Sequence, residues 1–134
     1  AKVTRPGDQV SVVTYGRHVL IANKVADELK GENISMEVVD LRSLYPYDWQ
    51  TVKESIRKTG RVLFLNEDTE VTNFGEHLAY RTVQELFYEL LARPQVLAGK
   101  QVPGIGLHPD LEDASVPMAK DLRQAIVSLV AEVP

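Results

Sequence analysis

Short runs rich in β-branched residues alternate along this chain with longer amphipathic runs, and no other feature of the sequence limits the possible folds as much. Such alternation is typical of strand–helix–strand units on a mainly parallel sheet. Four runs are predicted to be strands: Gln9–Thr14 (QVSVVT), Ile34–Leu41 (ISMEVVDL), Arg61–Glu67 (RVLFLNE) and the weaker Gln95–Ala98 (QVLA). The unbroken Val38-Val39 pair indicates a strand buried on both faces. We therefore predict a three-layer α/β domain with right-handed crossovers.

The runs between these strands carry the spacing and the end signals of helices. Asp48 is a predicted N-cap, because its carboxylate can accept from the free N–H groups of a first turn. Asn73 with Glu76 three residues later is typical of a capping box, and Gly31 and Gly60 are placed to end the first two helices. The residues predicted to face inward are Ala22, Val25, Ala26 and Leu29 in a helix over Arg17–Lys30; Trp49, Val52 and Ile56 after Asp48; Ala79, Val83, Leu86, Phe87 and Leu90 after Asn73; and Leu122, Ile126 and Leu129 in a closing helix over Leu122–Val130.

Composition limits the class of protein. With 134 residues the chain has the size of one domain, and we expect a single domain over 1–134, excised from a longer chain because it begins Ala1-Lys2 without methionine. A net charge of -4 without a cluster of Lys or Arg argues against a nucleic-acid partner. No apolar run is long enough for a membrane span. The absence of cysteine excludes disulfides and thiolate chemistry, and it fits a reducing compartment.

Ligands of open α/β sheets usually bind beyond the carboxyl ends of the strands, so any reactive groups are expected there. The first strand is followed by Tyr15 and Gly16, which form no glycine-rich phosphate loop, and the Gly104–Gly106 motif lies in a long irregular stretch over Gly99–Pro117. After the third strand, Glu67 and Asp68 could hold Mg²⁺ or act as acid and base. We favour the alternative that they satisfy loop backbone or a neighbouring domain.

The histidines and serines offer little catalytic chemistry. His18 and His77 each lie near a helix start, where surface positions are common, and we expect both in solvent or in an interface. His108 lies near Asp110, Glu112 and Asp113, which could mimic a metal cluster but fits a solvated acidic loop better. No serine lies in a G-x-S-x-G elbow. The sequence therefore predicts no active site within this domain alone.

Four stretches occur together in an order and spacing that resemble a known family: GDQVSVVTYGRHV (7–19), VVDLRSLYPYDWQTVKESIRKTGRVLFLNED (38–68), NFGEHLA (73–79) and VPMAKDL (116–122). They look like the C-terminal, transketolase C-terminal-like domain of the beta subunit of thiamine-dependent 2-oxo acid dehydrogenases of the pyruvate or branched-chain type. The resemblance implies a five-stranded mixed sheet with one antiparallel edge strand at Lys2–Arg5. It departs from the family pattern at Thr72-Asn73, where Gly-Gly is common, and at Met118, where a capping Ser or Thr is common and about 1 kcal/mol is expected to be lost unless Ser115 substitutes.

The resemblance also implies a function. In this family thiamine diphosphate and Mg²⁺ bind between two other domains, so we expect no catalytic, cofactor-binding or metal residue here. The domain would serve subunit assembly and docking, with the alpha subunit or remaining domains, a second beta subunit and the dihydrolipoyl acyltransferase as partners. The compartment would be the cytoplasm of a bacterium or the mitochondrial matrix. The candidate interface residues are Tyr15, Arg42, Tyr45, Tyr47, Glu67, Asp68, Phe74, Glu85 and Glu89.

The connection DLRSLYPYD (40–48) carries the most specific part of the resemblance. Asp40 would end a buried strand, Arg42 would place a charge at the carboxyl edge, and Pro46 would keep Tyr45 extended before Asp48 caps the next helix. Glu85 and Glu89 are candidates for meeting a basic partner domain, although a solvated helix face explains them equally well.

Three alternatives remain open. The C-terminal domains of transketolase and of deoxyxylulose-phosphate synthase share the implied fold but usually lack the Asp-Leu-Arg triplet at 40–42. A free-standing hydrolase or phosphotransferase would use Glu67 and Asp68. A small-ligand binding α/β domain would use a crevice near Tyr15 and Arg42, and a crevice filled by Tyr45 or Tyr47 would count against it.

Overall fold

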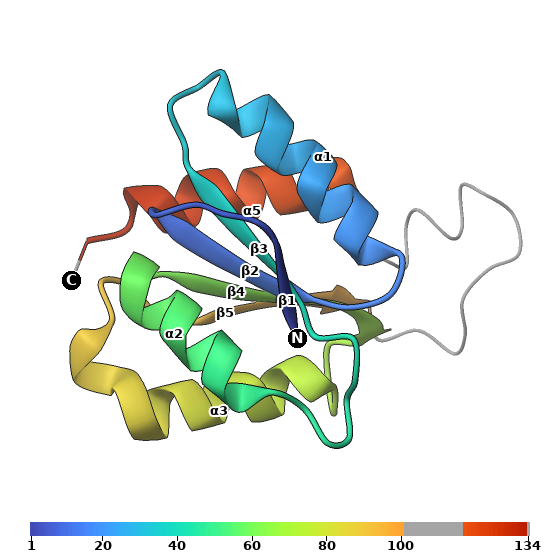
Figure 1. Ribbon diagram of the computed structural model, residues 1–134. Coiled ribbons are helices and arrows are strands. Elements are labelled where there is room, and N and C mark those ends of the chain that lie inside the picture. The colour runs from blue at the N-terminus through green and yellow to red at the C-terminus, as the bar shows by residue number, and fades with distance from the viewer. Residues whose placement is uncertain (101–116, 134) are drawn as a thin grey trace, which may run out of the picture.

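A mixed sheet forms the middle layer of the computed structural model, which describes residues 1–100 and 117–133 (Figure 1). Within those residues the sheet has five strands in the order β1-β3-β2-β4-β5. Their bounds are β1 Lys2–Arg5, β2 Val10–Thr14, β3 Met36–Asp40, β4 Val62–Thr69 and β5 Gln95–Gly99. β1 runs antiparallel to β3, and the other pairs are parallel. The predicted sheet and its antiparallel edge strand at Lys2–Arg5 are confirmed.

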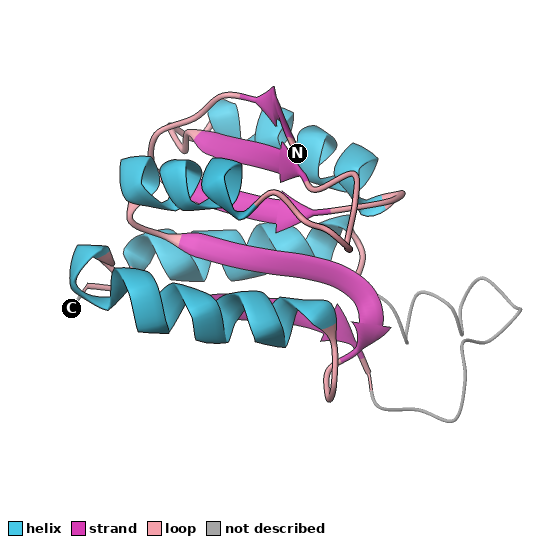
Figure 2. Ribbon diagram, turned by 60° about the horizontal axis from the view of Figure 1, so that its bottom comes forward, coloured by secondary structure: helices cyan, strands magenta, loops and turns pink. Residues whose placement is uncertain are grey.

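Helices cover both faces of the sheet, as Figures 1 and 2 show. The helices are α1 His18–Lys30, α2 Trp49–Thr59, α3 Phe74–Leu86 with a 3-10 turn η1 at Phe87–Glu89, and α5 Ala119–Ala131. Buried residues of α1 and α5 join Val12, Val38 and Leu63 in one apolar core. Buried residues of α2 and α3 join Val13 and Phe64 in a second core on the opposite face. Alternation along each strand therefore supplies both layers.

The predicted helix ends are largely confirmed. The Asp48 carboxylate accepts from the Thr51 N–H, and Asn73 forms the capping box with Glu76. Gly60 ends α2 in the left-handed region at φ 74°. Gly31 occupies the C-cap of α1 but stays right-handed at φ -67°.

The start of α5 differs from the family pattern as expected. Met118 makes no side-chain capping hydrogen bond, and the Asp121 carboxylate accepts from the Met118 N–H at 2.9 Å. Ser115, the substitute cap considered above, lies outside the described residues.

The predicted inward face of α3 is confirmed at Leu86 and is wrong at Val83 and Phe87. Leu78, Thr82 and Leu86 are buried, whereas Val83 is 37% exposed and Phe87 is 58% exposed. Thr82 can be buried because its hydroxyl donates to the Leu78 carbonyl of its own helix at 2.8 Å. A polar residue in the buried row shifted the apparent apolar stripe by one position. Ala79 and Leu90 pack at the margin of the core as partly buried residues.

The sheet order fixes where a ligand or partner would meet the strand ends. β2 and β4 are neighbours, but the chain leaves β2 through α1 toward β3 and leaves β4 through α3 toward β5. The switch point therefore lies between the carboxyl ends of β2 and β4, where open α/β sheets usually bind ligands. Among the described residues no helix is long and apolar enough to cross a membrane.

Candidate functional site

Five side chains gather at the switch point and are called here the strand-end cluster: Tyr15, Arg17, His18, Glu67 and Asp68. Arg17 Nε lies 2.9 Å from Glu67 Oε1, and His18 Nδ1 lies 3.5 Å from the same oxygen. The Asp68 carboxylate accepts from the Thr69 N–H at 2.9 Å. Burial, followed by the charges of Asp68 and Glu67, raises the pKa of the Tyr15 hydroxyl above its ordinary value of 10.0. Both acidic residues are thus engaged locally, which favours their interpretation as structural groups.

His18 is not at the surface, contrary to prediction. Its side chain is 0% exposed, and its Nε2 lies 2.8 Å from the Pro117 carbonyl, to which it donates because a carbonyl only accepts. The ring joins the start of α1 to Pro117, two residues before α5. His77 is exposed, as predicted, and His108 lies outside the described residues with Asp110, Glu112 and Asp113. In the described part of the chain no three His, Asp or Glu side chains are placed to share a metal ion.

A second group, the aromatic clasp, holds the DLRSLYPYD connection (40–48), which leads into α2, against α3. It consists of Tyr47, Trp49, Phe74, His77, Arg81 and Glu85. The Tyr47 hydroxyl lies 2.7 Å from His77 Nε2 and accepts from Arg81 at 2.7 Å, while Phe74 meets the Tyr47 ring edge-on at 5.2 Å. The Arg81 guanidinium lies 4.6 Å from the Trp49 ring centroid.

Glu85 completes the clasp. Its carboxylate accepts from Arg81 Nε at 2.7 Å and from Trp49 Nε1 at 3.1 Å, and Lys53 Nζ lies at 3.4 Å. Hydrogen bonds from Arg81 and Trp49 lower the pKa of the Glu85 carboxyl from 4.5 to about 2. Its charge is therefore balanced within the domain, while Glu89 pairs separately with Arg57 at 3.2 Å.

The clasp leaves the middle of the connection exposed. Tyr45 is 95% exposed, and Arg42 adopts a left-handed backbone at φ 63°. The Arg42 guanidinium lies 4.0 Å from the Asp40 carboxylate, which is at the limit of an ion pair. The Tyr45-Pro46 peptide bond is cis.

The candidate interface residues thus fall into separate places rather than one site. Tyr15, Glu67 and Asp68 belong to the strand-end cluster, and Tyr47, Phe74 and Glu85 belong to the clasp. Arg42 and Tyr45 lie on the connection, and Glu89 lies in η1. Sequence reasoning missed Arg81, because a surface arginine in a helix carries no signal until the aromatic residues it contacts are known.

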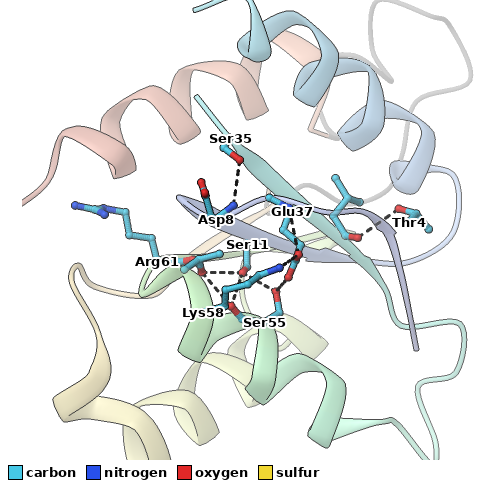
Figure 3. Close-up of polar contacts among 11 residues, drawn as sticks. Thr4, Asp8, Ser11, Ser35, Glu37, Ser55, Lys58 and Arg61 are labelled. Carbon is cyan, nitrogen blue, oxygen red and sulfur yellow. Dashed lines mark hydrogen bonds and ion pairs between the residues drawn. The ribbon is translucent and has the colours of Figure 1, made fainter. Parts of the chain in front are cut away.

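A buried polar network at the amino ends of the strands was also missed (Figure 3). Glu37 on β3 is 1% exposed, accepts from Ser55 at 2.5 Å and from the Gly7 N–H at 3.2 Å, and forms an ion pair with Lys58. Ser11 lies 2.7 Å from Ser55 through their hydroxyl oxygens. This network joins α2 to β2 and β3. Two polar residues placed between apolar neighbours in strands, Ser11 and Glu37, were the available signal.

An apolar groove of about 850 Å³ lies where α3 ends, and it is bordered by the end of α5. Its lining includes Val83, Phe87, Tyr88, Leu91, Pro94 and Val133. Tyr88 is 98% exposed, and the Phe87 and Tyr88 rings meet edge-on at 5.2 Å. Arg93 and Glu132 also line the groove and pair at 2.6 Å, and this contact lowers the pKa of the Glu132 carboxyl. The rim is therefore close to neutral around an exposed apolar surface, which is typical of an interaction site.

Comparison with known proteins gives one family. The family model described as "Transketolase, C-terminal domain" matches residues 1–122. A pyruvate dehydrogenase E1 component subunit beta from Rickettsia bellii is 35% identical over 126 residues, which cover 94% of this chain and 38% of that subunit. A 2-oxoisovalerate dehydrogenase subunit beta from Bacillus subtilis is 37% identical over 112 residues, 84% of this chain and 34% of that subunit.

The solved structures agree. A split-gene transketolase, described as an inactive beta4 tetramer, matches with a TM-score of 0.86 and 25% identity over 99% of this chain and 43% of that chain. The fold thus defines the class, a three-layer α/β domain with one antiparallel edge strand. The chain belongs to the transketolase C-terminal domain family, which confirms the resemblance inferred from its sequence motifs. It spans little more than a third of the length of these two beta subunits.

Proposed function

We propose that this chain is the C-terminal domain of the beta subunit of a thiamine-dependent 2-oxo acid dehydrogenase of the pyruvate or branched-chain type. The observation that carries the proposal is the match to two such subunits over 94% and 84% of the chain. In the complete enzyme, thiamine diphosphate and Mg²⁺ bind in other domains. The pairing of Glu67 with Arg17 supports this, because that carboxylate is already occupied. The compartment is the bacterial cytoplasm or the mitochondrial matrix.

The role of the domain is assembly and docking. Its partners are the alpha subunit or remaining domains, a second beta subunit and the dihydrolipoyl acyltransferase. The apolar groove supports a docking role, since burying Tyr88, Phe87 and Leu91 against a partner would remove apolar surface from water. Glu85 supports it less, because Arg81 and Trp49 already hold its carboxylate. Glu89 is the better candidate of the two acidic residues, with Arg57 as its one described partner.

Reconstitution of the complete enzyme tests the proposed activity. The chain, joined to its thiamine-binding part and mixed with the alpha subunit, is expected to decarboxylate pyruvate or a branched-chain 2-oxo acid with dichlorophenolindophenol as electron acceptor. Transfer of two-carbon units from a ketose phosphate, with no 2-oxo acid oxidation, would instead establish the transketolase alternative. The structural match to a split-gene transketolase keeps that alternative in view.

Substitution in the groove tests docking separately from chemistry. Tyr88→Asp is expected to weaken acyltransferase binding at least tenfold, because a charge would be buried without a partner, while acceptor-dye activity stays unchanged. Leu20→Asp is the matched control, because Leu20 is 76% exposed on α1, away from the groove. Equal acyltransferase affinity for both variants would rule out the groove as the docking surface. Glu89→Lys tests in the same way whether the acidic residue contributes to acyltransferase binding.

The two remaining alternatives find less support. Tyr47 packs against the apolar core of α2 and α3, whereas Tyr45 is 95% exposed and fills no crevice. No pocket described for the structure is lined by Tyr15 or Arg42, so the small-ligand alternative has no cavity among the described pockets to support it. A hydrolase or phosphotransferase would need Glu67 free to act as base. Isothermal titration of the chain with Mg²⁺, compared with Glu67→Ala, checks that alternative directly.

A further inference from the structure

A pocket of about 550 Å³, called here the amino-end pocket, lies beside the amino end of β3. This volume is in the range typical of small-molecule sites. The pocket is distinct from the crevice considered near Tyr15 and Arg42, because neither residue lines it. Its described lining holds two cationic residues and no carboxylate, and includes Arg5 at the end of β1, Ala26 and Lys30 on α1, and Asn33, Ser35 and Met36 at the entry to β3.

An irregularity in β1 turns Arg5 toward this pocket. In a regular strand, Arg5 and Val3 would point to the same face of the sheet. Val3 pairs with Val39, which belongs to the core of α2 and α3. Arg5 pairs instead with Val38, which belongs to the core of α1 and α5, so the register shift between the two pairs turns Arg5 to the α1 face. Bulges at sheet edges often re-aim a side chain beside a functional site.

The other polar groups of the pocket offer hydrogen-bond donors that the fold does not use. Lys30 and the side-chain amide of Asn33 have no hydrogen-bond or ion-pair partner among the described residues. The Ser35 hydroxyl accepts from the Asp8 N–H at 3.1 Å (Figure 3). The proton of that hydroxyl finds no acceptor in the same part of the chain, so it is available to a ligand.

Arg5 also keeps donors available, although it is paired. Its side chain is 24% exposed, and its Nη1 contacts Asp27, whose side chain is 71% exposed. An ion pair so open to water is weak. The remaining N–H groups of the guanidinium lie in a planar fork, which matches the spacing of phosphate oxygens.

The end of α1 opposes an anion less than a helix C-terminus usually does. Free carbonyls at such an end carry partial negative charge. Here the Leu29 carbonyl accepts from the Glu32 N–H at 2.9 Å and from the Ile34 N–H at 3.1 Å. The Lys30 carbonyl accepts from the Asn33 N–H at 3.2 Å. The last carbonyls of the helix are thus satisfied by the turn that follows it.

We propose that the amino-end pocket binds a small organic phosphate. The phosphate group lies between Arg5 and Lys30 and accepts from the Ser35 hydroxyl, while the organic part of the ligand covers Ala26 and Met36. A phosphate monoester carries a charge of about -1.5 to -2 and three acceptor oxygens at pH 7, so it matches two cations and a hydroxyl better than a carboxylate does. The bound ligand joins β1 to α1 and β3, and the site does not depend on the proposed function.

Binding of phenyl phosphate to the 134-residue chain tests the site. We expect saturable binding in isothermal titration calorimetry, a raised unfolding midpoint, and shifts of the Asn33, Ile34 and Ser35 amides in 1H–15N spectra. Benzoate has the same ring with a carboxylate and is expected to bind at least about tenfold more weakly. Benzoate binding as tight as that of phenyl phosphate would overturn the assignment of a phosphate.

Variants that remove one positive charge locate the ligand. Lys30→Gln and Arg5→Gln are each expected to weaken phenyl phosphate binding at least about tenfold. Lys24→Gln is the matched control, because Lys24 is also an exposed lysine of α1 but does not line the pocket. Lys30 is exposed, so Lys30→Gln is expected to keep the unfolding midpoint of the free chain, and it carries the test if Arg5→Gln does not fold. No saturable binding by the wild type, or equal weakening by Lys24→Gln and Lys30→Gln, would overturn the inference.

Discussion

Gly60 shows how closely one backbone position can be constrained. It ends α2 at φ 74°, a region that residues with a β-carbon rarely adopt, and a β-carbon added there would lie 2.7 Å from Leu91 Cγ. Gly31 ends α1 at φ -67°, and an added β-carbon would meet only the Glu28 carbonyl, at 3.5 Å. The two glycines both end helices, but they differ in whether the backbone and its neighbours leave room for a β-carbon.

Gly60→Ala is expected to lower the free energy of unfolding by more than about 1 kcal/mol, through backbone strain and displacement of Leu91. Gly31→Ala is expected to raise it by about 0.4–1 kcal/mol, because alanine restricts the unfolded chain without strain in the folded one. Urea unfolding of both variants measures the difference. Equal changes in the free energy of unfolding of the two variants would contradict the assignment of a left-handed backbone to Gly60 and a right-handed one to Gly31.

Met118 offers a test of the missing cap at α5. Its backbone is already extended, at φ -115° and ψ 175°, as an N-cap requires. Met118→Ser is expected to be about 1 kcal/mol more stable than Met118→Ala, because the hydroxyl can accept from the first turn of the helix. Thermal unfolding of the two variants provides the comparison, and alanine controls for the lost methionine packing. Identical midpoints would show that Asp121 already satisfies this end.

At the scale of elements, α3 carries two faces with separate uses. One face buries Leu78, Thr82 and Leu86 against the sheet, and the exposed side presents Arg81 and Glu85 to the clasp and Val83 to the groove. The clasp joins α3 to α2 and to the connection. Because Glu85 holds its bonds in the clasp as a charged carboxylate, the stability that the clasp contributes should depend on pH.

Glu85→Gln tests that dependence. The folded-state pKa of Glu85 is about 2, below its ordinary 4.5, so the native state favours the charged carboxylate. Its stabilising contribution is therefore present above pH 4.5 and is lost as the pH falls toward 2. The difference in unfolding free energy between wild type and variant should shrink across this range. A difference in unfolding free energy that stays constant from pH 4.5 to pH 2 would contradict the assigned hydrogen bonds. The other carboxylates titrate in both proteins, so their contributions cancel in this difference.

At the scale of the whole molecule, the exposed surfaces are divided between the two ends of the sheet. The connection lies after the carboxyl end of β3, whereas the groove adjoins the segment that leads into the amino end of β5. Neither surface contributes a reactive group, and both expose aromatic residues. This division gives the assembly and docking role proposed above two separate surfaces to use.

Phe87→Lys tests whether the apolar residues of the groove contribute to the stability of the fold. Phe87 is 58% exposed, so the substitution is expected to change the free energy of unfolding by no more than about 0.5 kcal/mol. The variant chain should also stay monomeric to higher concentration, because less apolar surface remains exposed. Analytical ultracentrifugation measures the second effect. A large loss of stability would show that the groove residues belong to the core.

Local patterns predicted much of this fold. Residues adjacent in sequence determine caps, so Asp48, Asn73 and Gly60 were identified correctly from short motifs. The stripe of α3 was misread because Thr82 satisfies its hydroxyl within the helix, a contact that hydrophobic spacing does not register. His18 was misplaced for a related reason: its partner, the Pro117 carbonyl, is 99 residues away.

The sequence by itself determined the order of strands and helices along the chain, the caps at Asp48, Asn73 and Gly60, and the family, because these depend on local backbone preferences and on motifs in fixed order. Only the tertiary structure decided that the buried Glu37 pairs with Lys58, that Arg81 and Tyr47 share a clasp, and that Tyr45 is 95% exposed. Each of these depends on groups brought together from distant parts of the chain. The burial of a charge and the exposure of an aromatic ring are properties of that arrangement.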